Sequence, residues 1–584
     1  MQATAHAGDG PGRGSALGFG PFELDLRAGE LRKAGRRIRL QEQPFQILRM
    51  LLESPGEVVL REEIRSRLWP DNTIVEFEHS INAAVKRLRD ALCDSAGKPL
   101  YIETMARRGY RFIGQVNPKA ASPGMAVTPS IAVLPFADLS GDRENEYFSD
   151  GLAEEIIANL SRGPGLKVIA RTSAFAFKGK QEDIRKIAQA LGVTNVLEGS
   201  VRRAGSRVRV IAQLIAAADG SHLWSERYDR DMADIFAIQD EIAQAISSAL
   251  QVRLSGVSRP HTPQLPAYEA YLKARHCMAS FTRESLASSR QFFERAIALD
   301  PSFAEAHSGL AMSILWLVFP GLSPAHEAMP LARAAAESAL DLDPASQAAH
   351  GVLGMVAATY EFDWKEAERR FKMAMTREPV PTYVRWYCAT YLLLVGRVRE
   401  AADQCLSGLK DDPLNFIGRF HNAAALLGAG NDDAGEAELR ELCALHPNLY
   451  QSFYLLSLSQ SLRGLHAEAL AAAENAYTLA PWNTGTTGVF AGALMRAGER
   501  RRAEELLQDL LPGDGYGTPL GLLVYSVMCS EIEQAANWAW KVLEQRDPRL
   551  IFIVGLMRSP SRSLLRSSGG WPALAARLDI PLSV

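Results

Sequence analysis

The second half of the chain is dominated by one constant interval. Four prolines stand 34 residues apart: Pro379, Pro413, Pro447 and Pro481. Four glycines keep the same step: Gly396, Gly430, Gly464 and Gly498. A small residue follows each of the first three glycines by five positions: Ala401, Gly435 and Ala469. Such regularity requires a structural unit that is repeated along the chain, because each copy must meet its neighbour in the same way.

An interval of 34 residues with a central glycine, a small residue and a closing proline resembles the tetratricopeptide (TPR) repeat, a pair of antiparallel helices. The resemblance predicts an all-α TPR superhelix over residues 266–560, whose concave groove usually binds peptides or proteins. Pro301 and Pro344 are 43 residues apart, which predicts an inserted turn between them. We expect aromatic residues such as Trp386 and Tyr391 to pack in the core, and residues 561–584 to form a C-terminal tail.

Residues 20–116 have a different pattern. The stretches "FELDL" and "GELRKAGRRIRL" alternate and predict a small antiparallel sheet. Three helices are predicted next, beginning near residues 41, 60 and 78. On the third helix an apolar stripe recurs at helical spacing: Ile81, Val85, Leu88 and Leu92. Two further strands, "LYIET" and "GYRFIG", then enclose the Arg107-Arg108 turn.

The opposite face of the third helix carries hydrogen-bonding, small and cationic residues: His79, Asn82, Ala83, Lys86 and Arg87. Such a face suits the DNA major groove, because Asn reads adenine, Lys or Arg reads guanine, and a small residue permits close approach. A basic helix face taken alone is usually only solvated. The surrounding domain therefore decides the interpretation.

The stretches "LWPDNTIVEFEHSINAAVKRLRDAL" and "PLYIETMARRGYRFIG" resemble the OmpR/PhoB-type winged helix, in the variant of CadC-like and HilA-like regulators. The resemblance covers about residues 40–114 and implies an α+β winged helix that binds DNA. In that family the third helix enters the major groove and the hairpin wing reaches the minor groove. Arg107 and Arg108 then lie at the wing tip, where a narrow groove attracts arginine, and Arg111 is a weaker candidate. Ala106 departs from relatives, which often have proline there.

Residues 130–255 alternate strands and helices, which predicts an α/β domain between linkers at 117–129 and 256–265. We expect its first helix to be capped at Ser149 or Asp150. The stretches "SIAVLPFADLSGD", "YFSDGLAEEI" and "GSHLWSERYDR" resemble the TolB amino-terminal-like domain, which accompanies class III adenylate cyclases and TPR regulators in bacteria. No activity follows from that family. We expect His222 to be structural and the arginines of residues 202–209 to line a solvated strand face.

Several classes of chemistry have no motif in the chain. Its six cysteines form no CxxC pair, so we expect neither a disulfide framework nor a zinc site. Phosphate-loop, HExxH, GxSxG and dinucleotide signatures are missing from the sequence, so we predict no enzyme, catalytic residue, cofactor or metal. Residues 1–19 are predicted to be a disordered leader, too short for a phosphorylated receiver domain. No apolar run reaches the roughly 18 residues of a membrane span.

These patterns predict a cytoplasmic one-component transcription regulator. A mildly basic winged helix would bind double-stranded promoter DNA, and a homodimer on DNA is compatible with this. The other regions would sense or recruit a partner, such as RNA polymerase, through the TPR groove. Two alternatives remain: a TPR scaffold whose winged helix binds protein, and a regulatory subunit of a nucleotide-cyclase-type enzyme.

Overall fold

Two units, Met1–Val127 and Thr128–Val584, make up the chain. The computed structural model describes residues 16–25, 30–33, 36–38, 40–68, 77–106, 108–114, 116–117, 129–140, 145–163, 165–180, 182–252, 261–280, 282–511, 513, 515–550, 553–554 and 567–578. Gly35, the tip residue Arg107, most of the predicted linker 117–129 and residues 256–260 of the predicted linker 256–265 lie outside these ranges.

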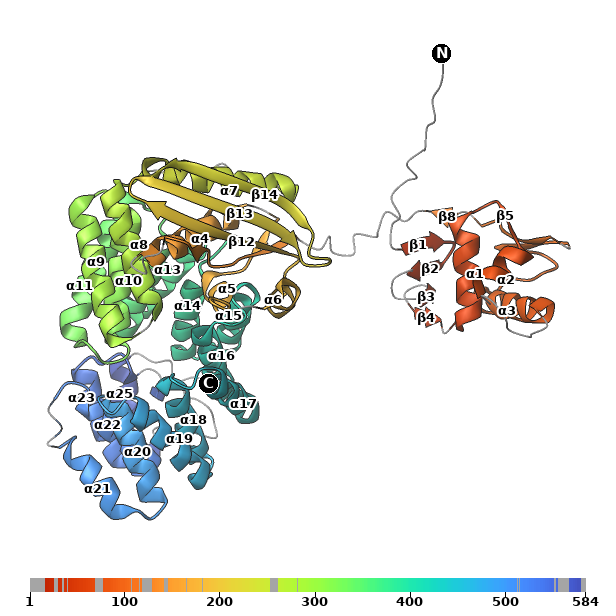
Figure 1. Ribbon diagram of the computed structural model, residues 1–584. Coiled ribbons are helices and arrows are strands. Elements are labelled where there is room, and N and C mark those ends of the chain that lie inside the picture. Colours follow the sequence, from red (N-terminus) through yellow and green to blue (C-terminus); the bar gives the residue numbers. More distant parts are fainter. Residues whose placement is uncertain are drawn as a thin grey trace. The chain divides into compact units, whose positions relative to one another are not determined.

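The first unit combines two antiparallel sheets with three helices (Figure 1). One sheet has the order β4-β3-β2-β1-β8, with strands Arg36–Ile38, Glu30–Lys33, Phe22–Asp25, Ala16–Phe19 and Val116–Asn117. The other has the order β5-β7-β6, with strands Val58–Leu60, Gly109–Phe112 and Ile102–Met105. The helices are α1 (Glu42–Glu53), α2 (Arg61–Leu68) and α3 (Phe77–Leu92).

The structure corrects both ends of the predicted winged-helix domain. Strand β1 lies inside the stretch 1–19 that was predicted to be a disordered leader, and β8 extends to Asn117. Because β1 pairs with both β2 and β8, it lies inside the first sheet and joins β8 to the other strands. Phe19 is buried there against Phe22 and Phe112. The domain therefore includes residues 16–117 rather than 20–116.

Asp94, just after α3, organises the start of the wing. Its carboxylate accepts hydrogen bonds from four backbone N–H groups, those of Ser95, Leu100, Tyr101 and Ile102, at 2.7–3.1 Å. Burial by itself raises the pKa of this carboxyl, but the backbone donors outweigh it and the pKa lies below its ordinary value. The ionised side chain thus joins the end of α3 to the first residues of β6.

We predict that Asp94→Ala lowers the unfolding free energy of the first unit by roughly 1–3 kcal/mol at pH 7. Because the folded-state pKa is depressed, the contribution of Asp94 is present above pH about 4 and is lost as the pH falls through the folded value. Urea unfolding of segment 16–117 at several pH values would measure this. Asp90→Ala, an exposed change on the same helix, is the control, and an equal loss there would contradict the prediction.

The second unit begins with a mixed sheet of order β11-β9-β12-β13-β14, with β10 paired to β12. Its strands are β9 (Ser130–Val133), β10 (Ala137–Asp138), β11 (Lys167–Val168), β12 (Asn195–Ala204), β13 (Arg207–Ala216) and β14 (His222–Asp231). Its helices are α4 (Glu146–Ser161), α5 (Arg171–Phe175), α6 (Ile184–Leu191) and α7 (Ile235–Ala249). Arg207 and Arg209 both pair with Asp229 on the neighbouring strand, so one carboxylate partly compensates their two charges within the sheet.

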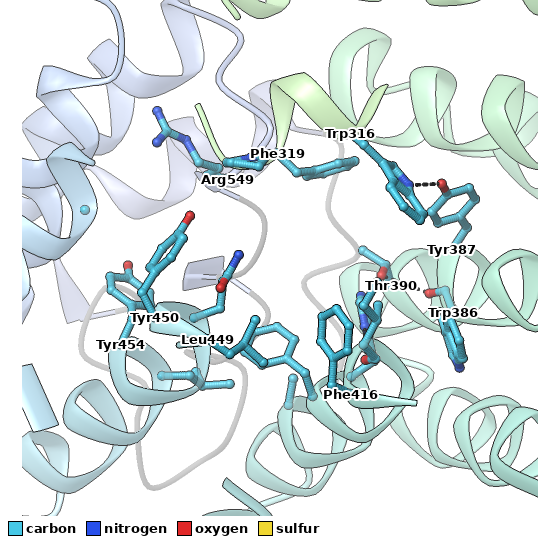
Figure 2. Close-up of a pocket in the computed structure, with 18 of the residues that line it drawn as sticks. Trp316, Phe319, Trp386, Tyr387, Thr390, Phe416, Leu449, Tyr450, Tyr454 and Arg549 are labelled. Atoms are coloured by element: carbon cyan, nitrogen blue, oxygen red, sulfur yellow. Dashed lines mark hydrogen bonds between the residues drawn. The ribbon is translucent and has the colours of Figure 1, made fainter. Parts of the chain in front are cut away.

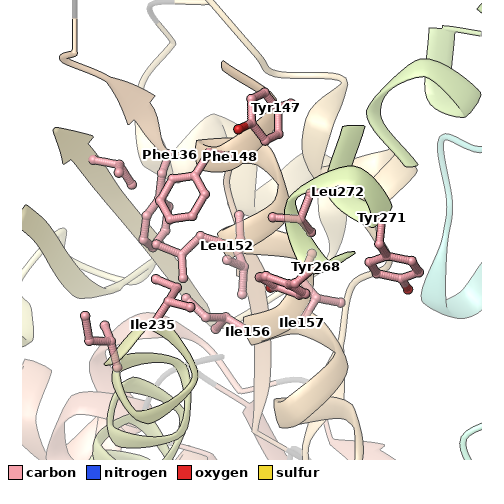
Figure 3. Packing of buried hydrophobic residues seen from close by; sticks show 14 of the residues in the cluster. Phe136, Tyr147, Phe148, Leu152, Ile156, Ile157, Ile235, Tyr268, Tyr271 and Leu272 are labelled. Carbon is pink, nitrogen blue, oxygen red and sulfur yellow. The ribbon is translucent and has the colours of Figure 1, made fainter. Parts of the chain in front are cut away.

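The predicted start of α4 is wrong. The helix begins at Glu146 with Asn145 at its N-cap position, and Ser149 and Asp150 lie buried inside it. The reason is that Tyr147 and Phe148, in the first turn, are drawn into the core beneath the sheet (Figure 3). Burial of two aromatic side chains outweighs the preference of Ser and Asp for a cap.

The same core continues into α8 (Leu265–Ser280), the first helix of the repeats. Figure 3 shows Tyr268, Tyr271 and Leu272 of this helix beside Leu152 and Ile156 of α4. A Cβ at Gly151 would lie 2.7 Å from Leu272, so only glycine allows this approach. The predicted linker therefore does not separate two domains, because the repeat region completes the core of the α/β region.

Ion pairs and hydrogen bonds add two further contacts between these regions. The buried carboxylate of Glu154 on α4 lies 2.6 Å from Arg275 on α8. Far along the chain, the backbone N–H and hydroxyl of Ser173 donate to the buried Asp412, at 2.9 and 2.5 Å. The sheet region thus contacts the repeats at two separate positions, at α8 and just after α15.

Helix pairs follow one another through the rest of the unit. They are α9 (Arg283–Leu299), α10 (Ala304–Val318), α11 (Ala325–Leu342), α12 (Gln347–Val356), α13 (Trp364–Ala374), α14 (Thr382–Leu394), α15 (Val398–Asp411), α16 (Phe416–Gly428), α17 (Asp432–Leu445), α18 (Tyr450–Leu462), α19 (His466–Leu479), α20 (Thr484–Arg496), α21 (Arg500–Gln508), α22 (Thr518–Met528), α23 (Ile532–Glu544) and α25 (Trp571–Arg577), with a π-helical turn at Ala357–Glu361. Among the described residues, no helix is both long and apolar enough to cross a bilayer.

The 34-residue interval has a direct structural cause. Each of the four glycines ends the first helix of a pair with φ between 79° and 85°, a left-handed conformation that other residues rarely adopt. The small residues that follow are buried where the two helices of a pair cross: Ala401, Gly435 and Ala469. The larger spacing between Pro301 and Pro344 is accommodated by the loop after α10 and by the 18-residue helix α11.

The predicted C-terminal tail is also wrong, because part of it completes the repeat core. Helix α25 packs Trp571, Leu574 and Ala575 against the last repeats. The indole of Trp364 donates to the carbonyl of Leu578 at 2.6 Å. Helix α13, in the first half of the repeat region, therefore touches the end of that region.

Candidate nucleic-acid interface

Helix α3 has one buried and one exposed face, as its periodicity predicts. Its apolar stripe is in the core together with Ala84: Ile81, Val85, Leu88 and Leu92. Asn82, Ala83, Lys86 and Arg87 are all exposed on the other face. The backbone of His79 is in α3, while its side chain lies outside what the structure describes. The predicted set thus shares one accessible helix surface, apart from His79, whose side chain is undetermined.

Asn82 is bound into a small network that the sequence did not reveal. Arg61, the first residue of α2, donates from Nη2 to Asn82 Oδ1 at 3.0 Å, and the Tyr110 hydroxyl donates to the same oxygen at 2.8 Å. Arg61 also donates to the Tyr110 hydroxyl at 3.0 Å, and its guanidinium lies 5.1 Å from the tyrosine ring centre. Since guanidinium can only donate, the amide oxygen must be the atom that faces it.

This network joins three elements at the interface: α2, α3 and β7 of the wing. The oxygen that an adenine-reading asparagine would offer to the base already accepts two hydrogen bonds. Base reading by Asn82 would therefore compete with Arg61 and Tyr110. The geometry makes Asn82 a residue that holds α3 against the wing.

The two exposed cations of α3 differ in their surroundings. Arg87 donates from Nη1 to Gln41 Oε1, just before α1, at 2.6 Å. Lys86 has no hydrogen-bond or ion-pair partner within the described part of the chain. Arg89, one turn along, points inward and donates to the Ile102 carbonyl and the Thr104 hydroxyl of β6, each at 2.8 Å. Lys86 is therefore the side chain of this face that is readiest to meet an anion.

The wing presents one described arginine at its tip. Arg108 is exposed, and its backbone carbonyl accepts a hydrogen bond from the N–H of Arg61. Arg111 lies on β7 opposite Glu103 of β6, and the two side chains form an ion pair at 2.6 Å. The positive charge of Arg111 is thus balanced inside the wing, so the structure does not group it with the cations of α3.

Sequence reasoning missed Arg61, Tyr110 and Arg89. The ring of Tyr110 is buried in the core, but its hydroxyl reaches the network. Arg61 and Arg89 look in the sequence like ordinary charged residues of a solvent-exposed helix face. Nothing in the order of residues shows which charged side chains will turn toward the wing.

Three helices, a C-terminal hairpin and an exposed polar helix face define a winged-helix domain of the kind used to bind DNA. Residues 35–112 match the family model described as "Transcriptional regulatory protein, C terminal", and residues 127–248 match "HilA/YgeH-like transcriptional regulator, second domain". The chain therefore carries an OmpR/PhoB-type domain followed by a HilA-like regulator domain. These matches are to transcriptional regulators and not to enzymes.

Individual relatives give a mixed picture. A protein of Rhizobium meliloti (strain 1021) named "Putative adenylate cyclase 3" is 39% identical over 272 residues, which cover 45% of this chain and 44% of that protein. This chain thus spans less than half of that relative. The transcriptional regulator HilA of Salmonella typhimurium is 24% identical over 403 residues, which cover 68% of this chain and 70% of HilA.

One solved structure that is similar is the DNA-binding domain of Klebsiella pneumoniae RstA in complex with the RstA box. It is 25% identical and covers 17% of this chain and 98% of that chain, with a TM-score of 0.16.

We predict that Tyr110→Phe keeps the buried ring but lowers the unfolding free energy of the first unit by about 0.5–1.5 kcal/mol, through loss of the bond to Asn82. A double-mutant cycle with Asn82→Ala should show coupling of similar size. Tyr101→Phe, in the same core, is the control. Strictly additive effects of the Tyr110 and Asn82 changes would mean that the network contributes nothing.

Proposed function

We propose that this chain is a sequence-specific DNA-binding transcription regulator of one-component type. Helix α3 enters the major groove of promoter DNA, and the wing tip with Arg107 and Arg108 reaches the adjacent minor groove. The observation that carries the proposal is the exposed face of α3, braced against the wing by the Asn82 network, in a domain that matches regulatory DNA-binding domains.

The residues of the interface would have different roles. Lys86 supplies an unpaired charge for a base edge or a phosphate, and Ala83 allows the helix to approach the groove closely. Arg87 and His79 are further candidates on α3. Asn82 mainly positions the helix, and it reads a base only if the bound DNA displaces Arg61 or Tyr110. Arg111 is a secondary candidate, because contact with phosphate requires it to leave Glu103.

The second unit is proposed to sense or recruit a partner. Its α/β region is of TolB amino-terminal-like type in this proposal, and its TPR-like repeats bind RNA polymerase or another protein. The proposed compartment is the cytoplasm, with the chain binding DNA as a homodimer. The alternative role, as a regulatory partner of a nucleotide cyclase, is supported only by the name of one relative.

The first test of this proposal uses salt. Changing Arg107 and Arg108 together to Ala should weaken cognate and random DNA by similar factors, because minor-groove arginines act chiefly through charge. The slope of log K against log salt should become less steep by up to about 2, at about 0.9 for each phosphate contact. Binding isotherms on two DNA sequences at several salt concentrations would measure this. If the double variant keeps the wild-type affinity and salt slope, the Arg107-Arg108 turn is only a solvated hairpin and does not contact DNA.

A second test separates base reading from general attraction. Lys86→Ala should weaken cognate binding markedly, and by roughly 1–3 kcal/mol if the lysine reads a guanine. Lys98→Ala removes an equal charge from the exposed loop before the wing and should have little effect. Equal losses in the two variants would argue that only net charge matters.

The third test removes the second unit. Because α8 completes the core of the α/β region, the chain should be cut between the units, after residue 127, rather than near residue 264. The segment 1–127 should still bind promoter DNA in a gel shift but lose normal control of the promoter in cells. Folded protein that fails to bind DNA at low salt would favour the scaffold alternative, and normal regulation by the segment would remove the sensor role.

A further inference from the structure

The repeat region closes on itself, and its inner face borders a cavity that is partly open to solvent. The amide of Asn483, at the start of α20, donates to the carbonyl of Pro320, just after α10, at 2.8 Å. The N–H of Ala325, the first residue of α11, donates to the Tyr516 hydroxyl at 3.0 Å. Together with the Trp364–Leu578 bond, these contacts join segments that are 163–214 residues apart in the chain.

A cavity of about 220 Å³ lies between these contacts. Figure 2 shows aromatic side chains around it, and they come from both sides of the closure: Trp316, Phe319, Tyr387, Phe416, Tyr450 and Tyr454. An apolar cavity of roughly 150 Å³ in a protein core accommodates benzene. This cavity therefore has room for one ring with substituents.

The charges near the cavity are balanced. Arg549, at its edge, donates from Nε and Nη2 to the buried carboxylate of Asp547, at 2.9 and 2.6 Å. Among the described lining residues it is the one permanent cation, and the lining includes no carboxylate. An anionic ligand would have to compete with Asp547, and a cationic ligand would lie near the guanidinium. The lining therefore favours an uncharged molecule.

Two lining residues have a buried polar atom that makes no hydrogen bond within the described residues: Gln451 Oε1 and Trp386 Nε1. The side-chain amide of Gln451, on α18, lines the cavity, and its buried Oε1 has no partner. A buried amide without a partner lowers stability. A ligand hydroxyl or N–H that reached this amide would restore the missing hydrogen bond. Two other polar groups of the lining have partners: the Tyr387 hydroxyl accepts from Trp316 Nε1 at 2.5 Å, and the Asn483 amide donates to the Pro320 carbonyl and the Tyr450 hydroxyl.

We propose that this cavity is a binding site for a small, uncharged, ring-containing molecule that carries one hydroxyl or N–H group, which pairs with Gln451. Because the lining comes from both ends of the repeat region, an occupant stabilises the closed form. The site also borders the sheet region: Phe416 of the cavity follows Asn415, whose amide donates to Asp412, and Asp412 accepts from Ser173. Binding of such a molecule would be the signal for the sensory role proposed above. The effect of binding in the cell therefore rests on that proposed function.

The test uses the full chain with p-cresol and p-xylene, two ligands of nearly equal shape that differ by the hydroxyl. Calorimetric titration and thermal melting should show saturable binding of p-cresol, with a dissociation constant below about 1 mM. p-Xylene should bind roughly three- to tenfold more weakly, as expected for one hydrogen bond. Tetramethylammonium and 4-methylbenzoate, which carry opposite charges, should bind more weakly than either.

Two variants make the test specific to the cavity. Ala424→Phe, on the lining of α16, should fill the space and weaken p-cresol binding at least roughly tenfold. Ala471→Phe, on the exposed face of α19, should leave it unchanged. Gln451→Leu should reduce the preference for p-cresol over p-xylene to about twofold or less, and Gln508→Leu, exposed on α21, should not. Circular dichroism verifies that each variant is folded.

The outcomes are decisive in both directions. Absence of saturable p-cresol binding, unchanged binding by folded Ala424→Phe, or tighter binding of either charged probe would overturn the proposal. If Ala424→Phe does not fold, the Gln451→Leu comparison decides, and an undiminished p-cresol preference there would also overturn it. Gel shifts of the same proteins without a probe test DNA binding separately, so failure of the proposed regulatory function would be seen independently of the cavity.

Discussion

The contact between α4 and α8 determines how the second unit is built. These helices approach closely at Gly151, bury Leu272 and Tyr268 in the core beneath the sheet, and are joined by Arg275 and the buried Glu154. Taking Glu154 out of water is costly unless its charge is paired, and its carboxylate forms ion pairs with both Arg275 and Arg171. Because α8 is also the first helix of the repeats, this contact sets the direction in which the repeat region starts.

Closure of the repeats depends on that starting point. A stack of helix pairs whose crossings are set by glycine turns and small residues curves by a fixed amount for each repeat. Here the curvature brings the loop after α10 to the start of α20, and brings Trp364 to the residues after α25. The hydrogen bonds between Ser173 and Asp412 fix the middle of the repeat region against the sheet region. The aromatic cavity is a consequence of this geometry, and no single motif encodes it.

In the first unit, the side chains that position α3 and the wing differ from the side chains that are exposed on their surface. Arg61, Tyr110 and Asp94 hold α3 and the wing in a fixed relation, whereas Lys86 and Arg108 present charge to the outside. In the proposed DNA complex, a fixed relation between α3 and the wing lowers the conformational entropy cost of binding the major and minor grooves together. For this reason changes in Arg61 or Tyr110 are expected to influence DNA binding without any direct contact.

Local patterns in the sequence predicted much of this molecule. The 3.6-residue periodicity of α3 identified both its buried stripe and its exposed residues, and the 34-residue interval identified the turns and crossings of the repeats, because each depends on neighbours that are close along the chain. Only the tertiary structure decided which polar partners Asn82, Arg87 and Arg111 choose, that α8 completes the core of the sheet region, and that α25 and the loop after α10 close the repeats. Those contacts join residues that lie far apart in sequence, and their energies depend on distance and burial in the folded chain, which the order of residues does not specify.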